Sequence, residues 1–403
     1  MQQIANRNVL ISGASIAGPA LAFWLKRYGF NPTIVEKAPA LREGGQAIDV
    51  LGTATDVLRR MGLLERVHEL QTGKRGTSYV AADGTVKASI SSEVFNGVGA
   101  NGDAEIARGD LSRVLYEATR EDVEYLFGDS IAALTETEDG VRVRFEHSPA
   151  RTFDLVIGAD GVHSHTRALV FGPESEFVRH MGYYISIFTM PNLLKLDRWE
   201  LDYNTPGKIA GSYSARENTE AKAIFAWASE QLDYDYRDID AQRRILTDTF
   251  AGQGWEVPRL LAELSAAQDF YFDAMAQITM ETWSKGRVSL VGDAGYCASP
   301  LSGQGADLSL VGAYLLAGEL AAAAGDYRVA FARYEREMRP MVDACQKFAE
   351  GVGRWYAPGS KAMIRVRNLN VRLLPYLPWR GLMGGTPQQV ARTVAAKSYA
   401  ARA

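Results

Sequence analysis

The sequence contains only two cysteines, Cys297 and Cys345, among its 403 residues. They lie far apart and belong to no metal-binding motif, which fits a reducing compartment and argues against a thiolate metal site. His163 and His165 are not spaced with carboxylates as metal ligands, so no metal is expected. The chain has no apolar run as long as a membrane span, and residues 1–8 are polar. We therefore expect a cytoplasmic protein.

The chain also lacks a strong overall charge, because 44 basic residues stand against 48 acidic ones. This near-balance gives no sign of nucleic-acid binding. The charge is unevenly placed: residues 351–403 hold nine Lys or Arg and no Asp or Glu, which leaves 35 basic and 48 acidic residues, a net −13, before them. This basic segment could rest on an anionic membrane surface. The favoured alternative is that it packs across the acidic body, with Arg stems covering apolar surface.

The first 40 residues carry the strongest motif. An apolar strand at 9–11 precedes a helix with apolar residues at i, i+3, i+4, i+7 and i+8, and 32–36 form a second strand. The turn between them, GASIAG at 13–18, is a G-x-S-x-x-G form of the dinucleotide-binding turn. Gly13 permits the tight turn, Ser15 lets a pyrophosphate approach, and Gly18 lets the helix pack closely. Glu36, 23 residues after Gly13, is placed to meet a ribose hydroxyl.

The next segments predict further strands and helices of the same domain. A helix is expected at 53–61, and another opens at 105–111 with Asp110 as its N-cap. Strands are expected at 123–127, 131–136 and 141–146, the last two joined by a two-residue Asp139-Gly140 turn and lying as a lid on the parallel sheet. Residues 97–102 also spell G-x-G-x-x-G, but no strand precedes them and no helix follows, so a loop is expected.

An aromatic, strand-like region at 183–225 predicts a second domain on an antiparallel sheet. A helix at 239–250 and a strand starting at 270 follow it. A last apolar strand at 288–291 runs into GDAGYCASPLSGQGAD at 292–307. Helices are then expected at 305–324 and 327–350, the second interrupted at Pro340.

Three stretches together resemble the flavoprotein monooxygenases that hydroxylate aromatic compounds: GASIAG with Glu36, DLVIGADGVHSHTR at 154–167, and GDAGYCASPLSGQGAD at 292–307. Residues 292–320 are most similar to the tetracycline-inactivating and polyketide-modifying branch. The resemblance covers nearly the whole chain and implies an α/β fold. A Rossmann-like FAD-binding domain with a parallel sheet would take residues 1–174 and 268–330. An α+β substrate-binding domain with an antiparallel sheet would take 175–267, and helices at 331–403 would close both.

The resemblance also implies the residues that hold FAD, with NADPH (or NADH) as a transient co-substrate. The implied FAD-binding residues are Gly13, Ser15, Ile16, Ala17, Gly18, Glu36, Lys37, Arg108, Asp160, Gly292, Asp293, Pro300, Gly303, Gln304, Gly305 and Ala306. The residues themselves agree, because 303–305 open a second helix end and Asp293 follows a buried strand. Two such sites far apart in sequence suit an extended cofactor. Asp160-Gly161 with Arg167 is associated in the family with both FAD and NADPH.

Substrate-binding candidates and their alternatives stay open at this point. The candidates are Gln46, Asp49, Tyr213, Phe225, Trp227, Phe272, Met275 and Pro300. The aromatic ones and Met275 could be plain sheet core. Asp160 and Asp293 could be helix or turn caps, and Arg108 a surface salt-bridge residue.

The function implied by the resemblance is hydroxylation of a polycyclic phenolic or enolic compound, tetracycline- or polyketide-like. In the family NADPH reduces the flavin, O2 adds to give a C4a-hydroperoxide, and its distal oxygen goes to an electron-rich carbon. No nucleophile or acid–base pair is demanded, because the cofactor supplies the chemistry. The alternatives are an FAD-dependent reductase or halogenase, although the W-x-W-x-I-P signature of halogenases is absent, and a non-catalytic flavin- or drug-binding protein. The expected partners are a small aromatic molecule and O2, and the chain is expected to be a monomer or weak dimer.

Overall fold

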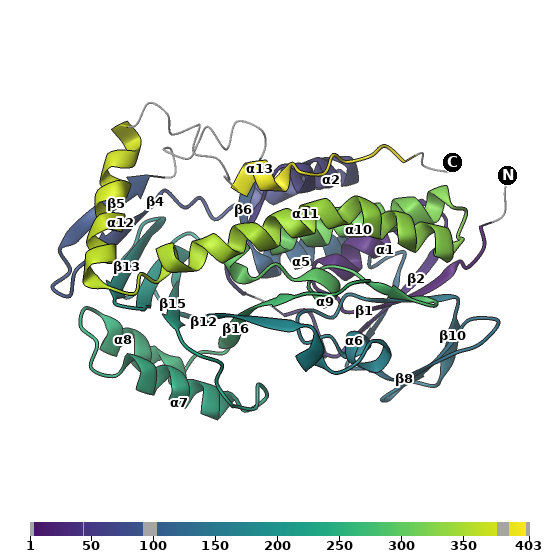
Figure 1. Cartoon of the computed structure of the whole chain (residues 1–403), viewed down its shortest axis with the longest axis horizontal. Coiled ribbons are helices and arrows are strands. Elements are labelled where there is room, and N and C mark those ends of the chain that lie inside the picture. Colours follow the sequence, from purple (N-terminus) through teal and green to yellow (C-terminus); the bar gives the residue numbers. More distant parts are fainter. Residues whose placement is uncertain (1–3, 43, 92–102, 377–386, 400–403) are drawn as a thin grey trace.

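The computed structural model describes residues 4–42, 44–91, 103–376 and 387–399. Its first sheet has six strands in the order β17-β18-β11-β1-β2-β7, parallel except for β17 (Figure 1). Their bounds are β1 Asn8–Ser12, β2 Asn31–Glu36, β7 Glu124–Phe127, β11 Leu155–Gly158, β17 Ser284–Lys285 and β18 Val288–Leu290. The central strands are buried, as expected of a parallel sheet covered on both faces.

Helices cover one face of this sheet and a small antiparallel sheet covers the other. Helices α1 (Ala17–Arg27) and α10 (Gly305–Ala322) pack together in the main core. On the other face, β8 (Ile131–Glu136), β9 (Val141–Phe145) and β10 (Arg151–Phe153) share a core with Leu10, Val35 and Val156. The predicted lid is thus confirmed. The two-residue turn is wrong, because Glu136 pairs with Val141 and leaves a four-residue loop between them.

The second sheet has seven strands in the order β16-β12-β15-β14-β13-β4-β5. Their bounds are β4 Gly76–Val80, β5 Val86–Ser91, β12 Val178–Pro191, β13 Trp199–Thr205, β14 Lys208–Ala215, β15 Glu220–Ala228 and β16 Tyr271–Ile278. All neighbours are antiparallel except β13 and β4. Strands β4, β5 and β16 come from ranges predicted for the FAD-binding domain, so the boundaries at 174 and 267 do not coincide with the sheets. Strands that belong to one predicted domain and pair in the sheet of the other hold the two domains together.

Between the sheets, β3 (Ala47–Val50) pairs with β6 (Ala104–Ala107), and α5 (Arg108–Glu117) follows directly. The helix therefore begins three residues after the predicted start at Glu105. Ala107, still in extended conformation, is the N-cap, so the prediction of Asp110 as N-cap was wrong. Asp110 lies inside the first turn and pairs with Arg113 instead.

The remaining helices frame the two sheets. They are α2 Thr53–Met61, α3 Leu64–Glu69, α6 His165–Val170, α7 Ile239–Phe250, α8 Val257–Ala262 and α9 Asp293–Tyr296, with short 3-10 turns at Glu174–Glu176, Glu263–Ser265, Pro300–Ser302 and Leu374–Tyr376. The helices predicted at 53–61 and 239–250 are confirmed. Within the described residues, only α10 is long and apolar enough to cross a membrane, and 89% of its residues are buried in the protein, as in a core helix.

Helix α11 (Tyr327–Tyr356) runs along both parts of the molecule (Figure 1). The predicted interruption at Pro340 was wrong, because the helix continues through it. Pro340 lies on the exposed side, whereas Met338, Met341 and Cys345 are fully buried on both sides of it. Burial of that face offsets the roughly 3 kcal/mol that an internal proline costs.

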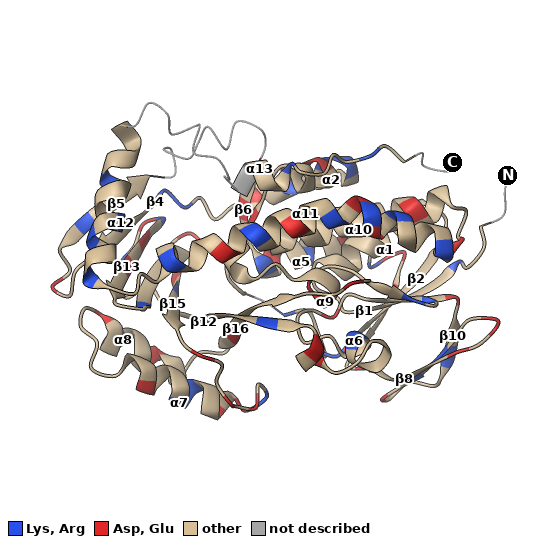
Figure 2. Ribbon diagram, in the orientation of Figure 1, with Lys and Arg blue, Asp and Glu red and all other residues tan. Residues whose placement is uncertain are grey.

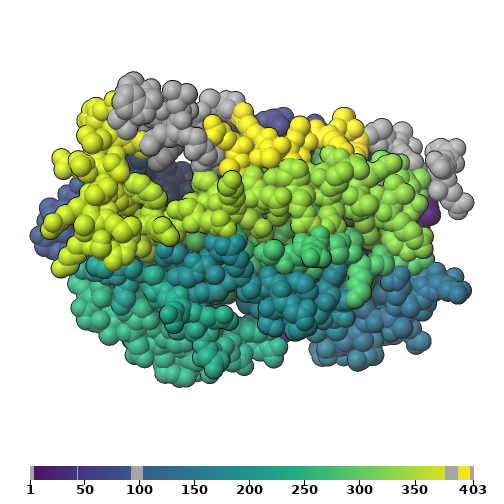
Figure 3. Space-filling view, viewed as in Figure 1, coloured from purple at the N-terminus to yellow at the C-terminus, as the bar shows by residue number. Residues whose placement is uncertain are grey.

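The C-terminal segment divides into two parts. Helix α12 (Lys361–Leu373) carries basic residues and exposes Met363, Val366 and Leu369 (Figure 2). Helix α13 (Pro387–Ala391) and the residues up to 399 instead lie along α10 and α11 (Figure 3). There Lys397 pairs with Glu319 at 3.2 Å and Glu337 at 2.9 Å. Residues 387–399 of the basic segment thus pack on acidic side chains of α10 and α11.

Arg60 of α2 holds Ala396 and Lys397 of this last segment by hydrogen bonds. Replacing Arg60 is therefore expected to weaken the packing of the segment. Its guanidinium donates to Lys397 O, to Ala396 O at 2.9 Å and to Tyr314 Oη at 2.6 Å. We expect Arg60→Met to lower the free energy of unfolding by about 1–3 kcal/mol and to expose the C terminus to proteases. Urea unfolding and limited proteolysis would measure both effects. Arg59→Met on the same helix is the control, since Arg59 pairs only with Asp56 on the surface; equal losses in both variants would contradict the assignment.

Candidate active site

In the glycine turn after β1, a side chain would fit at neither Gly13 nor Gly18. Gly13 has φ +111°, and a Cβ there would lie 2.4 Å from the carbonyl oxygen of Ala159. A Cβ on Gly18 would lie 1.9 Å from the carbonyl oxygen of Gly13. Helix α1 then begins with no side-chain cap and no acidic residue in its first turn. Its N-terminal amides are therefore free to meet an anion, as the sequence predicts.

Glu36 ends β2 beside this turn. Its carboxylate accepts the amide of Ala14 at 2.8 Å and that of Ala38 at 2.9 Å. The side chain is thus held at the mouth of the glycine turn, where the predicted ribose contact requires it. Lys37 follows directly on the exposed edge.

Arg108 connects the turn to the second motif. Its guanidinium donates to Ser15 Oγ at 3.0 Å. It also acts on Asp293: burial raises the pKa of that carboxyl, and the positive charge of Arg108 opposes the rise. Arg108 makes no ion pair with a surface acid among the described residues. The salt-bridge alternative is therefore wrong, and residues from 15, 108 and 293 meet in one place.

The second helix end of the site is the N-terminus of α10, at the sequence Gly303-Gln304-Gly305. Gly303 adopts φ +66°, and α10 begins at Gly305 with no side-chain cap. The side chain of Gln304 is fully buried, yet neither its nitrogen nor its oxygen has a hydrogen-bond partner among the described residues. Buried amides are normally satisfied, so an unpaired one at an uncapped helix end indicates a ligand position.

Strand β3 and the residue after it form hydrogen bonds to the start of α10 and to the second sheet. The amide of Leu51 donates to Asp307 Oδ1 at 2.9 Å, two residues into α10. The amide of Ala47 donates to Tyr213 Oη at 3.2 Å in the second sheet. Gln46 and Asp49 therefore lie between the two helix N-termini and the second sheet. The arrangement fits an extended, phosphate-bearing dinucleotide with its ring end toward that sheet.

The fold and this site define a dinucleotide-binding oxidoreductase. A family model described as FAD binding domain matches residues 6–349. An uncharacterized protein of Mycobacterium tuberculosis is 52% identical over 341 residues, covering 84% of this chain and 92% of its own. A flavin-dependent monooxygenase of Legionella longbeachae is 43% identical over 343 residues, covering 85% and 88%. The solved structure of tetracycline destructase Tet(51) matches with a TM-score of 0.85 at 35% identity over 98% of this chain and 100% of that one.

The chain therefore belongs to the FAD-dependent monooxygenase family. The resemblance, the α/β fold class and the FAD requirement predicted from the sequence are confirmed. When bound, the flavin supplies the redox chemistry. The residues that would hold it are those of the two helix ends, Glu36, Arg108 and Asp293.

The Asp160-Gly161 sequence, called the DG motif below, and the associated Arg167 bind groups of the protein itself. Asp160 accepts both the amide and the hydroxyl of Thr166 at 2.8 Å, and the hydroxyl of Ser164. Arg167 is fully buried and donates to the carbonyl oxygens of Ala294 at 2.9 Å and Val162 at 2.7 Å. The cap alternative thus describes Asp160. Arg167 joins this loop to the one that carries Asp293, through Ala294.

Three predicted substrate residues lie on the wrong face of the second sheet. Phe225, Trp227 and Phe272 are at most 7% exposed and pack in a core with residues of α7 and α8. Their neighbours in sequence, which point the opposite way, face α11 and the Pro300–Ser302 turn. The substrate role predicted for these three residues was therefore wrong, and the core alternative holds.

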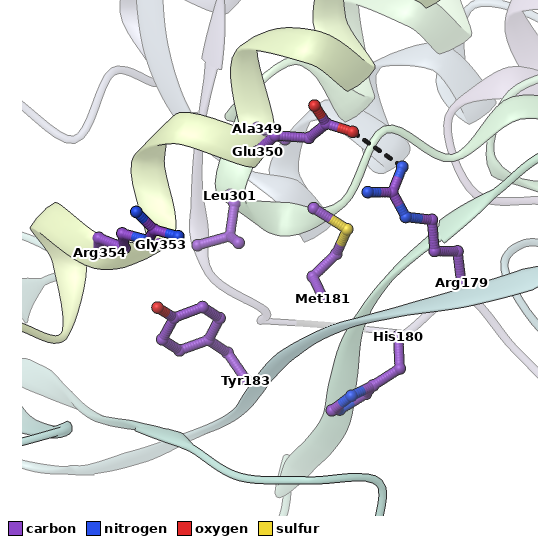
Figure 4. A pocket seen from close by; sticks show the side chains of 9 residues that line it. All are labelled: Arg179, His180, Met181, Tyr183, Leu301, Ala349, Glu350, Gly353 and Arg354. Carbon is purple, nitrogen blue, oxygen red and sulfur yellow. Dashed lines mark hydrogen bonds and ion pairs between the residues drawn. The ribbon is translucent and has the colours of Figure 1, made fainter. Parts of the chain in front are cut away.

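Met275 and Tyr213 lie on the other face, together with Leu301, the residue after Pro300. A pocket of about 240 Å³ opens beside this turn, between β12 and α11 (Figure 4). The side chains of Met181, Tyr183 and Leu301 point into it, and an Arg179–Glu350 ion pair of 2.8 Å closes one side. Arg179, His180, Glu350 and Arg354 also line this pocket, so it offers a small apolar wall among charged groups, next to the predicted position of the flavin ring.

Sequence reasoning missed a polar cluster on the same face. It consists of Lys74, Tyr79, Glu105, Glu200, Asp202 and Arg367. Lys74 Nζ lies 3.1 Å from Glu200 and 3.6 Å from Glu105. Polar alternation in β13, with Glu200, Asp202 and Asn204 on one side, was a signal for it.

Asp49 gives the site a measurable pH dependence. Burial, with Glu105 and Asp103 nearby, raises the pKa of Asp49 to about 6 from its ordinary value of 3.8, although Lys74 opposes the rise. The carboxyl nevertheless reaches solvent, as a group on a cleft wall does. The folded state therefore favours the protonated acid.

The stability that this preference supplies is expected to be complete below about pH 4 and lost as the pH rises through about 6. Urea unfolding of the flavin-free protein would measure it, because the difference between wild type and Asp49→Asn should fall between about pH 4 and 7. Asp248→Asn, on the exposed side of α7, is the control. A constant difference between wild type and Asp49→Asn would contradict the assignment.

Proposed function

We propose that the protein uses FAD, NADPH and O2 to hydroxylate a polycyclic phenolic or enolic compound of the tetracycline or polyketide type. NADPH supplies two electrons, one oxygen atom forms the new C–O bond, and the other leaves as water. The observation that carries the proposal is the pocket beside Leu301, four residues before the uncapped start of α10, in which the apolar side chains of Met181 and Leu301 and the ring of Tyr183 lie among charged groups. The likeness to tetracycline destructase Tet(51) supports the substrate class.

The residues of the chain bind, orient and exclude water. The two helix N-termini, Arg108 and Ser15 hold the negative pyrophosphate, and Glu36 and Asp293 accept sugar hydroxyls. Gln304 supplies an amide to the polar edge of the flavin ring. Leu301, Met181 and Tyr183 form the wall of the pocket against which an aromatic substrate lies. This wall keeps water from the reacting atoms, which favours oxygen transfer over uncoupled oxidation.

Purified protein is expected to carry flavin and to oxidise NADPH under air only when a suitable phenol is present. A screen of phenols and polyketides, followed by mass spectrometry, should find a product with one added oxygen atom. Absence of flavin would contradict the proposal. NADPH oxidation without an oxygenated product would indicate a reductase, a product containing halide a halogenase, and binding without oxidation a carrier.

A further inference from the structure

Asp202 is a buried carboxyl with one unpaired oxygen. It is 5% exposed, and its Oδ1 has no hydrogen-bond partner among the described residues. Its Oδ1 lies 2.2 Å from the position that a Cβ on Gly211 would take, so it projects over that glycine. Asp202 and Gly211 are opposite each other in register and therefore point to the face that holds Tyr213. A carboxyl left unpaired in this way requires a partner that the chain does not supply.

The nearest cations do not supply it. Arg367 donates to Asn204 Oδ1 at 2.8 Å and lies 3.8 Å above the ring of Tyr79, and it forms no ion pair with Asp202. Lys74 is held between Glu200 and Glu105. With Asp49, the cluster holds four carboxyl groups against two basic side chains. Burial raises the pKa of Asp202 and of Asp49, so each of these two groups favours the neutral acid until a cation lies beside it.

The surroundings suit an organic cation more than a bare metal ion. Tyr79, Tyr213 and Tyr356 lie within electrostatic range of Asp202 and Glu200. Aromatic faces attract ammonium groups, and carboxylates next to them pair with the N–H. No group of three or more metal-binding side chains suitable for a metal ion occurs in the described part of the chain.

The cluster is partly open to solvent at Lys74 and Glu200, whose side chains are 32% and 14% exposed. Tyr213 is tied to Ala47 of β3, the strand next to the start of α10. A substrate lying on the flavin ring would thus extend one end toward Glu200 and Asp202.

We propose that Glu200 and Asp202 form a subsite for a cationic amino group of the substrate. The inference rests on the proposed function, since it requires that the substrate occupies this face of the second sheet. It selects a phenolic compound with a protonated amine at one end over its neutral counterpart. Glu200 Oε2 already accepts Thr77 Oγ1 at 2.9 Å and faces Lys74, so Asp202 supplies the unpaired charge.

The test compares two matched naphthol probes, one with a dimethylaminomethyl group and one with an isobutyl group, which has the same shape but no charge. Binding is followed by the change in flavin absorbance of the FAD-loaded protein. We expect the amine to bind about 10-fold tighter or better, as one added ion pair allows. Asp202→Asn and Glu200→Gln should each remove most of this preference and leave the neutral probe unchanged. Glu220→Gln, at the far end of β15, should change neither.

Three outcomes would overturn the proposal: equal affinity of the two probes, no binding of the amine, or an amine preference that survives in both variants. Tighter binding of the neutral probe would overturn it as well, because the subsite would then prefer an apolar group to an ammonium group. Flavin content and circular dichroism of each variant show that folding is intact. Substrate-dependent NADPH oxidation in the same samples tests the proposed function separately, because it does not depend on which probe binds more tightly.

Discussion

Gly18→Ala is expected to abolish stable flavin binding. A Cβ at this position would stand 1.9 Å from the carbonyl oxygen of Gly13, a backbone atom that cannot rotate away. The helix must move off β1, and the amides at its N-terminus then leave the phosphate position. An overpacked contact of this kind costs about 1–3 kcal/mol, which corresponds to a roughly 5- to 200-fold loss of FAD affinity if the cost falls on the bound state. Flavin absorbance after gel filtration, and titration of flavin-free protein with FAD, would measure it.

The control is Gly351→Ala in α11, where a new Cβ meets no atom within 4 Å. Alanine favours helix by up to about 1 kcal/mol over glycine, so this variant should keep its flavin and be slightly more stable. If Gly18→Ala retains wild-type flavin affinity, the close helix–strand contact is not what positions the phosphate. Loss of flavin from both variants would point to general instability instead.

The cofactor half of the site could be predicted because its signals are local. The turn at 13–18 lies within one β–α unit, where glycine spacing and helix periodicity are set by neighbouring residues. Glu36 ends β2 and Asp293 follows β18 by three residues, so the parallel order of these strands brings both to the same edge of one sheet. The position of Arg108 was not derivable in this way. It depends on β6 pairing with β3, a contact across 58 residues from Ile48 to Ile106 that no local pattern encodes.

The prediction of the substrate-binding residues failed for a physical reason. In a strand, residues one apart point to opposite faces, and aromatic side chains suit either face. Phe225 and Trp227 were chosen as aromatic residues, but Phe250 and Leu260 cover their face from α7 and α8. Which face of the second sheet is left for the cofactor depends on where α7 and α8 pack. The polar alternation of β13 would have been the better guide, because buried carboxyl groups are rarely retained for packing alone.

Arg167→Met is expected to cause the largest loss of stability and to release flavin as well. Arg167 is fully buried, and its guanidinium joins the carbonyl oxygen of Val162 in the DG loop to that of Ala294, the residue after Asp293. Methionine fills much of the space but leaves both carbonyl groups without a donor, at about 1–3 kcal/mol each. Breaking the charge interaction with Glu174 adds to this loss.

We therefore expect the free energy of unfolding to fall by about 3–5 kcal/mol, with weaker FAD binding because the loop carrying Asp293 is no longer held. Arg179→Met is the matched control, since Arg179 is 57% exposed and pairs with Glu350 at the surface, an interaction worth about 0–1 kcal/mol. Arg167→Lys separates charge from geometry: it keeps the positive charge but cannot reach both carbonyl groups, so it should recover little. Full recovery by lysine would mean that charge alone, rather than the double carbonyl contact, links the DG loop to the second motif.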